Sequence, residues 1–239
     1  MMEQCHGKWK TFGEKGNPTY RIERGRLTPE GSHFQLIRHH EKLEFFTPLL
    51  GDFNVVNAAA AVITALELGL NREQIREGLS AFERVPGRME GFRSPGGFWV
   101  VVDYAHTPDA LKNALKTAFA FTSNHLITVF GCGGDRDRKK RPEMGRIAAE
   151  LSHHVIVTSD NPRTEDPERI IRDILEGVPA SASFQVVEDR ETAIREALIQ
   201  AKPGDTVMIA GKGHENYQIL GHERIHFNDR EIVQKYLNA

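Results

Sequence analysis

From residue 97 to the C-terminus, short apolar runs alternate with longer amphipathic segments. The apolar runs are rich in β-branched and aromatic residues, and they predict strands at Trp99–Val102, Leu126–Phe130, Val155–Thr158, Phe184–Val187 and Thr206–Ala210. The intervening segments have apolar residues at three- and four-residue spacing, and they predict helices at Pro108–Phe121, Pro142–Leu151, Pro167–Glu176, Arg190–Ala201 and Asp229–Tyr236. Three of these helices are expected to begin at proline, which the first helical turn tolerates. This alternation is typical of βαβ units, so the fold class is α/β with a mostly parallel sheet and flanking helices.

The first 85 residues have a different pattern. Short apolar segments joined by polar, glycine-containing turns predict antiparallel hairpins with strands at Thr19–Glu23, Phe34–Ile37 and Leu43–Phe46. Two helices are expected next, at Asn54–Leu68 and, after an Asn71 cap, at Arg72–Phe82. Proline and glycine in Val85-Pro86-Gly87-Arg88 then interrupt both periodicities and indicate a hinge. We therefore expect two domains, residues 1–85 and 86–239.

Composition narrows the class of protein. A chain of 239 residues with 39% hydrophobic content can form one good core or two modest ones. The formal net charge of -2 gives no basic excess, so no nucleic-acid partner is expected. Cys5 and Cys132 stand far apart, which suits a reducing compartment. No apolar run approaches the ~20 residues of a membrane helix and no signal-peptide core is present, so we expect a cytoplasmic protein without membrane association.

Glycine and charged residues follow four of the predicted parallel strands. These segments are Asp103–His106, Gly131–Arg136, Asp160–Arg163 and Gly211–Glu215. Each alone could be an ordinary turn or a solvated charge run. Ligands of parallel sheets collect beyond the carboxyl ends of the strands, so four such loops on one edge favour a binding site. Neither GxxxxGK[ST] nor GxGxxG occurs, so no Walker-type triphosphate cradle is predicted.

Six motifs in order resemble the Mur ligase family, over a stretch that runs from about Gly51 to the C-terminus. They are Gly51-Asp52-Phe53-Asn54-Val55-Val56-Asn57-Ala58-Ala59-Ala60, Val85-Pro86-Gly87-Arg88-Met89-Glu90, Val102-Asp103-Tyr104-Ala105-His106-Thr107-Pro108-Asp109-Ala110-Leu111, Phe130-Gly131-Cys132-Gly133-Gly134-Asp135-Arg136-Asp137-Arg138, Asp160-Asn161-Pro162-Arg163 and Ala210-Gly211-Lys212-Gly213-His214-Glu215. The last three are similar to the branch of the family that adds meso-diaminopimelate. The resemblance implies a Rossmann-like C-terminal domain, residues 86–239, that binds the incoming amino acid. Residues 1–85 would be the end of the family's α/β ATP-binding central domain.

The resemblance also implies a reaction. Mur ligases of this branch form an amide bond in peptidoglycan precursor synthesis, adding meso-2,6-diaminopimelate to UDP-N-acetylmuramoyl-L-alanyl-D-glutamate. ATP and Mg²⁺ drive the reaction through an acyl phosphate. The family's P-loop, magnesium ligands and carbamylated lysine have no counterpart in this sequence, so we do not expect the chain to catalyse the reaction alone.

Site residues follow from the matching motifs. The resemblance implies that Arg136 and Arg163 bind carboxylate, that Asp160 and Glu215 bind ammonium, and that Asn161 and the Gly211 backbone add hydrogen bonds. L-Lysine lacks the distal carboxylate of diaminopimelate and would leave an arginine without its partner, so a preference for diaminopimelate is predicted. On the nucleotide side, the resemblance implies roles for Asn54, Asn57, Arg88, Asp103, Tyr104 and His106.

Several alternatives remain open. Asn54 could instead cap the alanine-rich helix, and Asp103 could stabilise the start of the next helix. No catalytic residue or metal ligand is identified, since His39-His40 and His153-His154 lack the spacing of a metal site. Lys139 stands where family members commonly have glycine, so the loop after Arg136 is expected to be stiffer and more basic. The chain could also be a non-catalytic amino-acid or muropeptide-binding fragment, or part of a related ligase that uses L-lysine.

Overall fold

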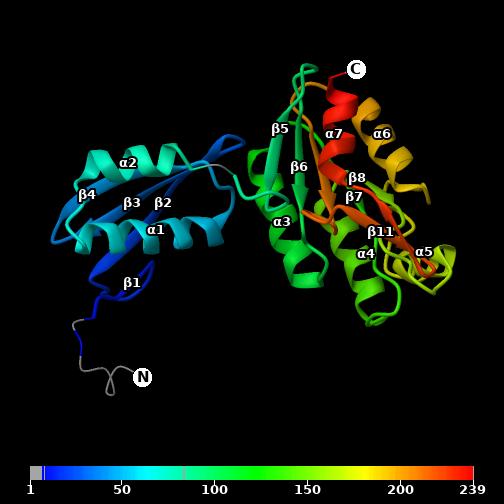
Figure 1. The fold of residues 1–239 in the computed structure, drawn as a ribbon, viewed down its shortest axis with the longest axis horizontal. Coiled ribbons are helices and arrows are strands. Elements are labelled where there is room, and N and C mark those ends of the chain that lie inside the picture. The colour runs from blue at the N-terminus through cyan, green and yellow to red at the C-terminus, as the bar shows by residue number, and fades with distance from the viewer. Residues whose placement is uncertain (1–6, 8, 83, 239) are drawn as a thin grey trace. The chain divides into compact units, whose positions relative to one another are not determined.

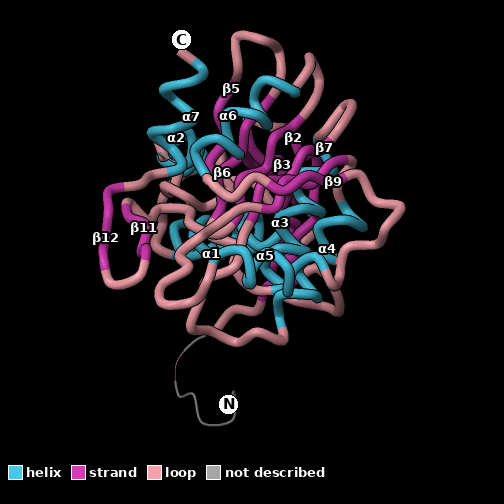
Figure 2. The backbone as a smooth tube through the Cα atoms, turned by 90° about the vertical axis from the view of Figure 1, so that its right-hand side faces the viewer, coloured by secondary structure: helices cyan, strands magenta, loops and turns pink. Residues whose placement is uncertain are grey.

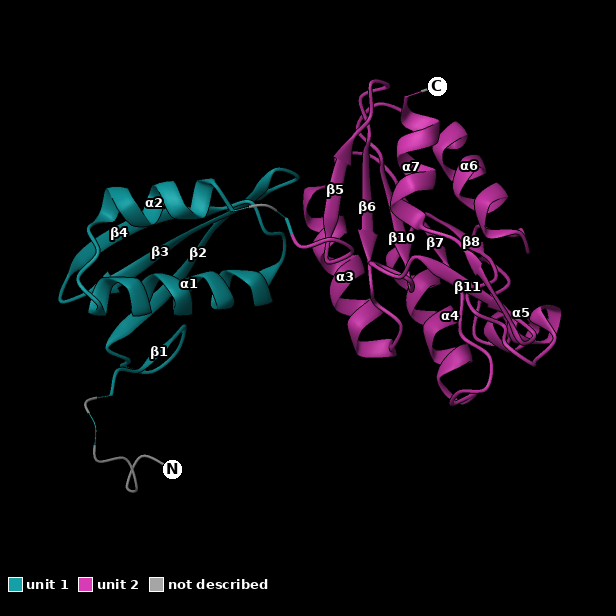
Figure 3. Ribbon diagram, viewed as in Figure 1, with its two compact units in different colours: residues 1–84 teal, residues 85–239 magenta. Residues whose placement is uncertain are grey.

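The computed structural model describes residues 7, 9–82 and 84–238. The protein divides into two compact units, residues 1–84 and 85–239 (Figure 3). The domain boundary expected from the sequence lies one residue later, after residue 85.

Unit 1 combines one sheet with two helices (Figure 1). Its elements are β1 (Phe12–Gly13), β2 (Tyr20–Thr28), β3 (Gly31–Arg38), β4 (Glu41–Thr47), α1 (Asp52–Glu67) and α2 (Arg72–Ser80). Strands β2, β3 and β4 pair antiparallel, as the hairpin pattern predicts, and β1 pairs parallel with β2. His39 and His40 form the two-residue turn between β3 and β4, and both have positive φ. This turn geometry matches the right-handed twist of a hairpin.

Alternate residues of the three long strands build the core of unit 1. Tyr20, Ile22, Phe34, Leu36, Leu43 and Phe45 are buried on one face of the sheet. Ala58, Ala59 and Val62 of α1 and Ile75 of α2 pack in the same core. The period-two burial in the strands and the three- and four-residue spacing in α1 are the patterns by which the sequence predicts these elements.

Unit 2 contains a six-stranded, mostly parallel sheet. Its strands are β5 (Glu90–Arg93), β6 (Trp99–Asp103), β7 (Leu126–Phe130), β8 (His154–Val157), β9 (Phe184–Val186) and β10 (Thr206–Ala210). Its helices are α3 (Pro108–Phe121), α4 (Lys140–Leu151), α5 (Pro167–Leu175), α6 (Arg190–Gln200) and α7 (Asp229–Leu237). The strand order is β5-β6-β10-β7-β8-β9, with only β5 antiparallel to its neighbour. The predicted α/β fold class is confirmed.

Helices cover both faces of this sheet. Helices α3, α4 and α5 pack in series on one side, and α6 packs with α7 on the other (Figures 1 and 2). Val100, Val102, Ile127 and Ile209 point into the core shared with α6 and α7. Because side chains alternate along a strand, the residues between them face α3 and α4 and are buried too. Burial on both faces explains why these strands read as continuous apolar runs.

Some predicted boundaries are wrong. Helix α4 begins at Lys140, so Pro142 is its third residue rather than its first. Three strands of unit 1 are longer than expected, and α1 begins at Asp52 instead of Asn54. The sequence reading missed β1, β5 and a hairpin formed by β11 (Tyr217–Leu220) and β12 (Glu223–His226), whose two strands are labelled side by side in Figure 2. Within the described residues, no helix has the length and apolar character that crossing a membrane requires.

Candidate functional site

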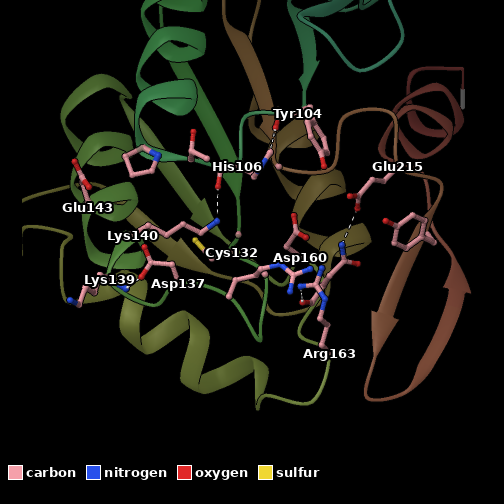
Figure 4. A pocket seen from close by; sticks show the side chains of 18 residues that line it. Tyr104, His106, Cys132, Asp137, Lys139, Lys140, Glu143, Asp160, Arg163 and Glu215 are labelled. Carbon is pink, nitrogen blue, oxygen red and sulfur yellow. Dashed lines mark hydrogen bonds between the residues drawn. The ribbon is translucent and has the colours of Figure 1, made fainter.

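Four adjacent strand ends in unit 2 surround one cavity. Strands β6, β10, β7 and β8 are neighbours in the sheet and run parallel, so the loops after them meet at one edge. The cavity at this edge has a volume of about 660 Å³, which is within the usual range for a small-molecule site. Figure 4 shows that its side chains come from all four loops. The convergence predicted from the chain order is therefore present.

The Asp160–Arg163 segment forms part of the cavity wall. Asp160 and Asn161 are buried, and burial raises the pKa of the Asp160 carboxyl group, although Arg190 and Lys212 act in the opposite direction. Arg163 has a positive φ of 54°. The hairpin holds this backbone, because Arg163 N donates to Ile219 O at 3.1 Å and Gly221 N donates to Arg163 O at 2.7 Å.

The Arg163 side chain is only partly engaged. Its Nη1 donates to Gly134 O at 2.7 Å and approaches Asn161 O at 3.4 Å. Its Nε and Nη2 have no hydrogen-bond partner among the described residues, and the side chain lines the cavity (Figure 4). A guanidinium fixed at one nitrogen, with its remaining donors free, suits a carboxylate ligand.

A buried arginine holds the loop after β7 in place. Arg141 Nη2 donates to Gly133 O at 3.3 Å and to Glu165 Oε1 at 2.8 Å, and its Nη1 donates to Asp173 Oδ2 at 2.8 Å. The hydrogen bonds from Arg141 hold the pKa of Glu165 down at about 2. The network ties α4, α5 and the glycine loop together.

The loop itself packs closely against the Asp160–Arg163 segment. A Cβ at Gly134 would lie 1.9 Å from Pro162 O, so only glycine fits. Arg136 Nη1 donates to the neighbouring Asp135 O at 2.9 Å, and its side chain lines the cavity. Lys139 adopts a right-handed φ of -63°, so a side chain at this position costs no backbone strain.

The loop after β10 contributes Gly211 and Glu215 to the cavity lining. Gly211 lines the cavity with a positive φ of 122°, and a Cβ there would lie 2.6 Å from Asp160 Oδ2. Glu215 Oε2 accepts a hydrogen bond from Asn161 Nδ2 at 2.9 Å (Figure 4). Asp160, Asn161 and Glu215 thus lie together although up to 55 residues separate them in the sequence.

The opposite wall comes from the loop after β6 and the start of α4. Tyr104 and His106 line the cavity, their rings 4.5 Å apart between centroids. Lys140 Nζ donates to His106 O at 2.7 Å (Figure 4). The Arg88 guanidinium lies 4.7 Å from the centroid of the Tyr104 ring and does not line the cavity.

One alternative role that the sequence left open is wrong. Asn54 does not cap α1, because Gly51 is the N-cap residue; the buried Asn54 Nδ2 instead donates to Leu50 O at 2.8 Å. The N-cap of α3 is Thr107, and a stabilising effect of Asp103 on the start of this helix stays a prediction. Asp103 Oδ2 accepts from Met89 N at 2.8 Å, and burial raises the pKa of its carboxyl group. Asn57 Nδ2 reaches Asn54 Oδ1 at 3.5 Å within unit 1.

Cys132 lines the cavity. Burial raises the pKa of its thiol to about 12, so the protonated form is favoured at neutral pH. No group of three or more His, Cys, Asp or Glu residues is placed to hold a metal ion in the described parts of the chain.

A family model described as "Mur ligase, glutamate ligase domain" matches residues 87–213. The chain belongs to the Mur ligase family. It is 55% identical over 213 residues to the UDP-N-acetylmuramoyl-L-alanyl-D-glutamate--2,6-diaminopimelate ligase of Gloeobacter violaceus, covering 89% of this chain and 44% of that protein.

Solved structures of Mur ligases have the same fold. A UDP-N-acetylmuramoyl-L-alanyl-D-glutamate--2,6-diaminopimelate ligase superposes with a TM-score of 0.75 and 41% identity, over 96% of this chain and 47% of that one. The MurF ligase of Thermotoga maritima in complex with ADP has a TM-score of 0.65 and 14% identity, over 96% and 48% of the two chains, and shows the fold alone. The chain thus spans less than half the length of these relatives.

The cavity of this Mur ligase chain brings together eight of the residues expected from the sequence. They are Tyr104, His106, Arg136, Asp160, Asn161, Arg163, Gly211 and Glu215. Arg88 and Asp103 do not line the cavity but contact Tyr104 and Met89, and Asn54 and Asn57 belong to unit 1. The sequence reading missed Lys140 and Glu143 on α4 and Tyr217 on β11, which also line the cavity. Nothing local in the sequence marks these three, because two lie in a helix and one lies in a short hairpin.

Proposed function

We propose that this chain carries the acceptor-binding part of a cytoplasmic, ATP-dependent ligase of peptidoglycan precursor synthesis. The reaction would add meso-2,6-diaminopimelate to UDP-N-acetylmuramoyl-L-alanyl-D-glutamate. ATP would phosphorylate the glutamyl carboxylate of the UDP-muropeptide. The amine of diaminopimelate would then attack the acyl carbon, forming the amide bond as phosphate leaves and the amine loses a proton. In this division of labour, residues 86–239 hold the acceptor and residues 1–85 belong to the ATP-binding domain.

The observation that carries the proposal is the mixture of fixed charges around one cavity. Asp160 and Glu215 lie beside Asn161 and Gly211, while Arg136 and Arg163 supply cations on the same cavity wall. Meso-diaminopimelate has two carboxylates and two ammonium groups, so it needs both signs at fixed positions. The two arginines would bind carboxylate, the two acidic residues ammonium, and Asn161 with the Gly211 backbone would add hydrogen bonds.

Positioning is what such a site contributes to amide formation. An amine held in line with an activated carboxyl group reacts far faster than one free in solution. The partly engaged Arg163 guanidinium supports this role, since its backbone and Nη1 are held while its other donors remain free. The ligand would therefore meet a donor set that is already oriented.

On the nucleotide side, Arg88 lies over the Tyr104 ring and the edge of the His106 ring meets that of Tyr104. These three residues would approach a nucleotide carried by the rest of a ligase. Asn54 and Asp103 would act through their neighbours, since their side chains already bond to Leu50 O and Met89 N. Asn57, in unit 1, is also proposed to act on the nucleotide side. ATP with Mg²⁺ would supply the energy for carboxylate activation.

Binding without turnover is the second candidate for the chain by itself. The sequence contains no Walker-type loop, and no metal-binding group occurs among the described residues. Incubation of the chain with ATP, Mg²⁺, the UDP-muropeptide and diaminopimelate should release no phosphate above the blank. Steady phosphate release that depends on diaminopimelate would show instead that this chain contains the activating machinery.

The proposal is tested by calorimetric titration of the chain with meso-diaminopimelate and with L-lysine. We expect diaminopimelate to bind about ten- to a hundredfold more tightly, because lysine leaves a guanidinium without its charged partner. Equal affinity would favour the alternative of a lysine-using ligase. If neither amino acid produces a heat of binding, the chain does not contain the proposed acceptor site.

A further inference from the structure

The loop after β10 contains a buried lysine between residues that line the cavity. Lys212 is fully buried and does not line the cavity, although Gly211 before it and Glu215 after it do. Its ammonium lies near the rings of Tyr217 and Phe227, at 5.6 and 5.9 Å from their centroids. Burying a lysine costs several kcal/mol unless its charge is well paired. The burial of Lys212 next to the cavity therefore needs a compensating interaction.

The Lys212 ammonium determines how the Asn161 amide is oriented. Lys212 Nζ donates to Asn161 Oδ1 at 3.0 Å, and Ile219 N donates to the same oxygen at 3.0 Å. An ammonium and a backbone N–H can only donate, so the oxygen of the amide must face them. The Asn161 Nδ2 is thereby turned toward Glu215 Oε2, to which it donates at 2.9 Å.

The same lysine fixes one oxygen of Glu215. Lys212 Nζ lies 3.4 Å from Glu215 Oε2, the oxygen that Asn161 also bonds. Glu215 Oε1 has no partner among the described residues, and Glu215 lines the cavity. Glu215 Oε2 is thus held by Asn161 and Lys212, while Glu215 Oε1 remains available to a ligand.

Lys212 lies in a cluster of charged groups. Five buried or half-buried groups interact here, namely Asp160, Glu215, Asp229, Arg190 and Lys212. Arg190 and Asp229 are fully buried and form a bidentate pair at 2.8 Å. Because Arg190 is paired with Asp229, Lys212 is the cation that contacts Glu215 and adds to the favourable electrostatic interactions of Asp160.

We propose that Lys212 is a positioning residue for the amine-binding end of the acceptor site: it orients the Asn161 amide, holds Glu215 by one oxygen and offsets the charges of Asp160 and Glu215. The inference rests on the proposed function for the identity of the ligand only. Burial lowers the pKa of Lys212, and the carboxylates of Asp160, Glu215 and Asp229 oppose this. The lysine thus depends on the acidic groups that it positions.

The first test needs no ligand. The protonation of Asp160 is followed by ¹³C NMR of labelled aspartate carboxyl groups, with D160N to assign the signal. Lys212→Met keeps the aliphatic stem but removes the charge, and it should raise the Asp160 midpoint by about one pH unit, since a nearby opposite charge is worth that much or more. Arg190, Asp229, Glu215, Tyr104 and Cys132 also interact with Asp160, and they remain unchanged in the variant.

Two further variants control this measurement. Lys116→Met removes the same charge from the exposed face of α3 and should leave the Asp160 midpoint where it is in the wild type. Lys212→Gln retains one donor for Asn161 and provides the same comparison if Lys212→Met fails to fold. A lysine that only fills space would lower the melting temperature without moving the midpoint, and an unchanged midpoint in the folded variant would overturn the proposal.

The second test is a double-mutant cycle on binding of meso-diaminopimelate. Lys212→Met should weaken binding about tenfold in the wild-type background, by release of Glu215 and Asn161. In a Glu215→Gln background the same substitution should change affinity less than about twofold, because residues that act as a unit are not additive. Equal losses in both backgrounds would contradict the proposal. If the wild-type chain binds no diaminopimelate, the proposed function fails, and the Asp160 midpoint still decides the role of Lys212.

Discussion

Individual residues of this site are constrained by close approach as much as by charge. Gly211 lies at the carboxyl end of β10, and a Cβ there would lie 2.6 Å from Asp160 Oδ2. Its φ of 122° lies in a region that residues with a side chain rarely adopt. The backbone of Gly211 can therefore line the cavity only because no side chain stands between it and Asp160.

Substitution of Gly211 should damage the site more than a comparable substitution elsewhere. Gly221 also has a positive φ, of 60°, but nothing lies within 4 Å of a Cβ built there. We expect Gly221→Ala to cost about 1 kcal/mol of unfolding free energy from backbone strain alone. Gly211→Ala should cost more, and it should also weaken binding of diaminopimelate.

Chemical denaturation and calorimetric titration of the two glycine variants provide the comparison. If Gly211→Ala and Gly221→Ala lose equal stability and both retain affinity, the crowding against Asp160 has no energetic consequence.

The sequence predicts the site residues that belong to motifs in loops. It does not predict a site residue whose role depends on burial. Asp160, Arg163 and Glu215 follow predicted strands, so the topology alone placed them at one edge. Lys212 sits in Gly211-Lys212-Gly213, which resembles an exposed loop, yet it is fully buried. Burial depends on the packing of Tyr217 and Phe227, which come later in the chain and which no local pattern connects to Lys212.

At the scale of elements, Arg141 connects α4 to α5 and to the loop after β7. Its guanidinium is fully buried between Glu165, Asp173 and Gly133 O. Glu165 Oε1 also accepts a hydrogen bond from Asp135 N at 2.6 Å. The loop that carries Arg136 and contacts Arg163 is thus held in one conformation by the ion pair between Arg141 and Glu165.

This ion pair should make stability depend on pH. The pKa of Glu165 is about 2 in the folded chain, below its ordinary value near 4.3. A depressed pKa stabilises the fold above the unfolded value, and the stabilisation is lost as pH falls from about 5 toward 2. Glu165→Gln should therefore cost about 1–2 kcal/mol at pH 7 and progressively less toward pH 2.

Urea denaturation of the wild type, Glu165→Gln and the exposed control Glu168→Gln at several pH values measures this difference. A Glu165→Gln effect that does not shrink as pH falls would mean that the carboxylate charge is not what stabilises the loop.

The β11–β12 hairpin shows where element prediction stops. Its strands are four residues each, and all of β12 is exposed, so no alternation of apolar and polar residues distinguishes it from a loop. It nevertheless holds the Arg163 backbone through two hydrogen bonds and places Tyr217 in the cavity wall. By contrast, β7, β10 and α3 have the predicted boundaries, because buried parallel strands and a strongly amphipathic helix have patterns that are easily recognised.

At the scale of the whole molecule, each unit has its own hydrophobic core. The sheet of unit 1 packs on α1 and α2, and the sheet of unit 2 packs between its two layers of helices. Every residue that lines the cavity belongs to unit 2. The acceptor site should therefore be complete within residues 85–239.

A chain consisting of residues 85–239 should fold and retain the site. Its size is typical of an independent domain. We expect a cooperative thermal transition and an affinity for meso-diaminopimelate within about twofold of that of the whole chain. Residues that are distant from a site and share no partners with it usually affect it little. Circular dichroism and calorimetry check both points. A shortened chain that fails to fold, or that folds and does not bind, would show that unit 1 is needed for the site.

In the proposed function, the Arg163 guanidinium binds the carboxylate that meso-diaminopimelate has and L-lysine lacks. The most direct measurement is titration of wild-type and Arg163→Gln chains with both amino acids, with Arg169→Gln as a control on the exposed face of α5. We predict that Arg163→Gln weakens diaminopimelate binding about ten- to a hundredfold and changes lysine binding little, while Arg169→Gln changes neither. Parallel losses for both amino acids, or no loss for diaminopimelate, would contradict the account.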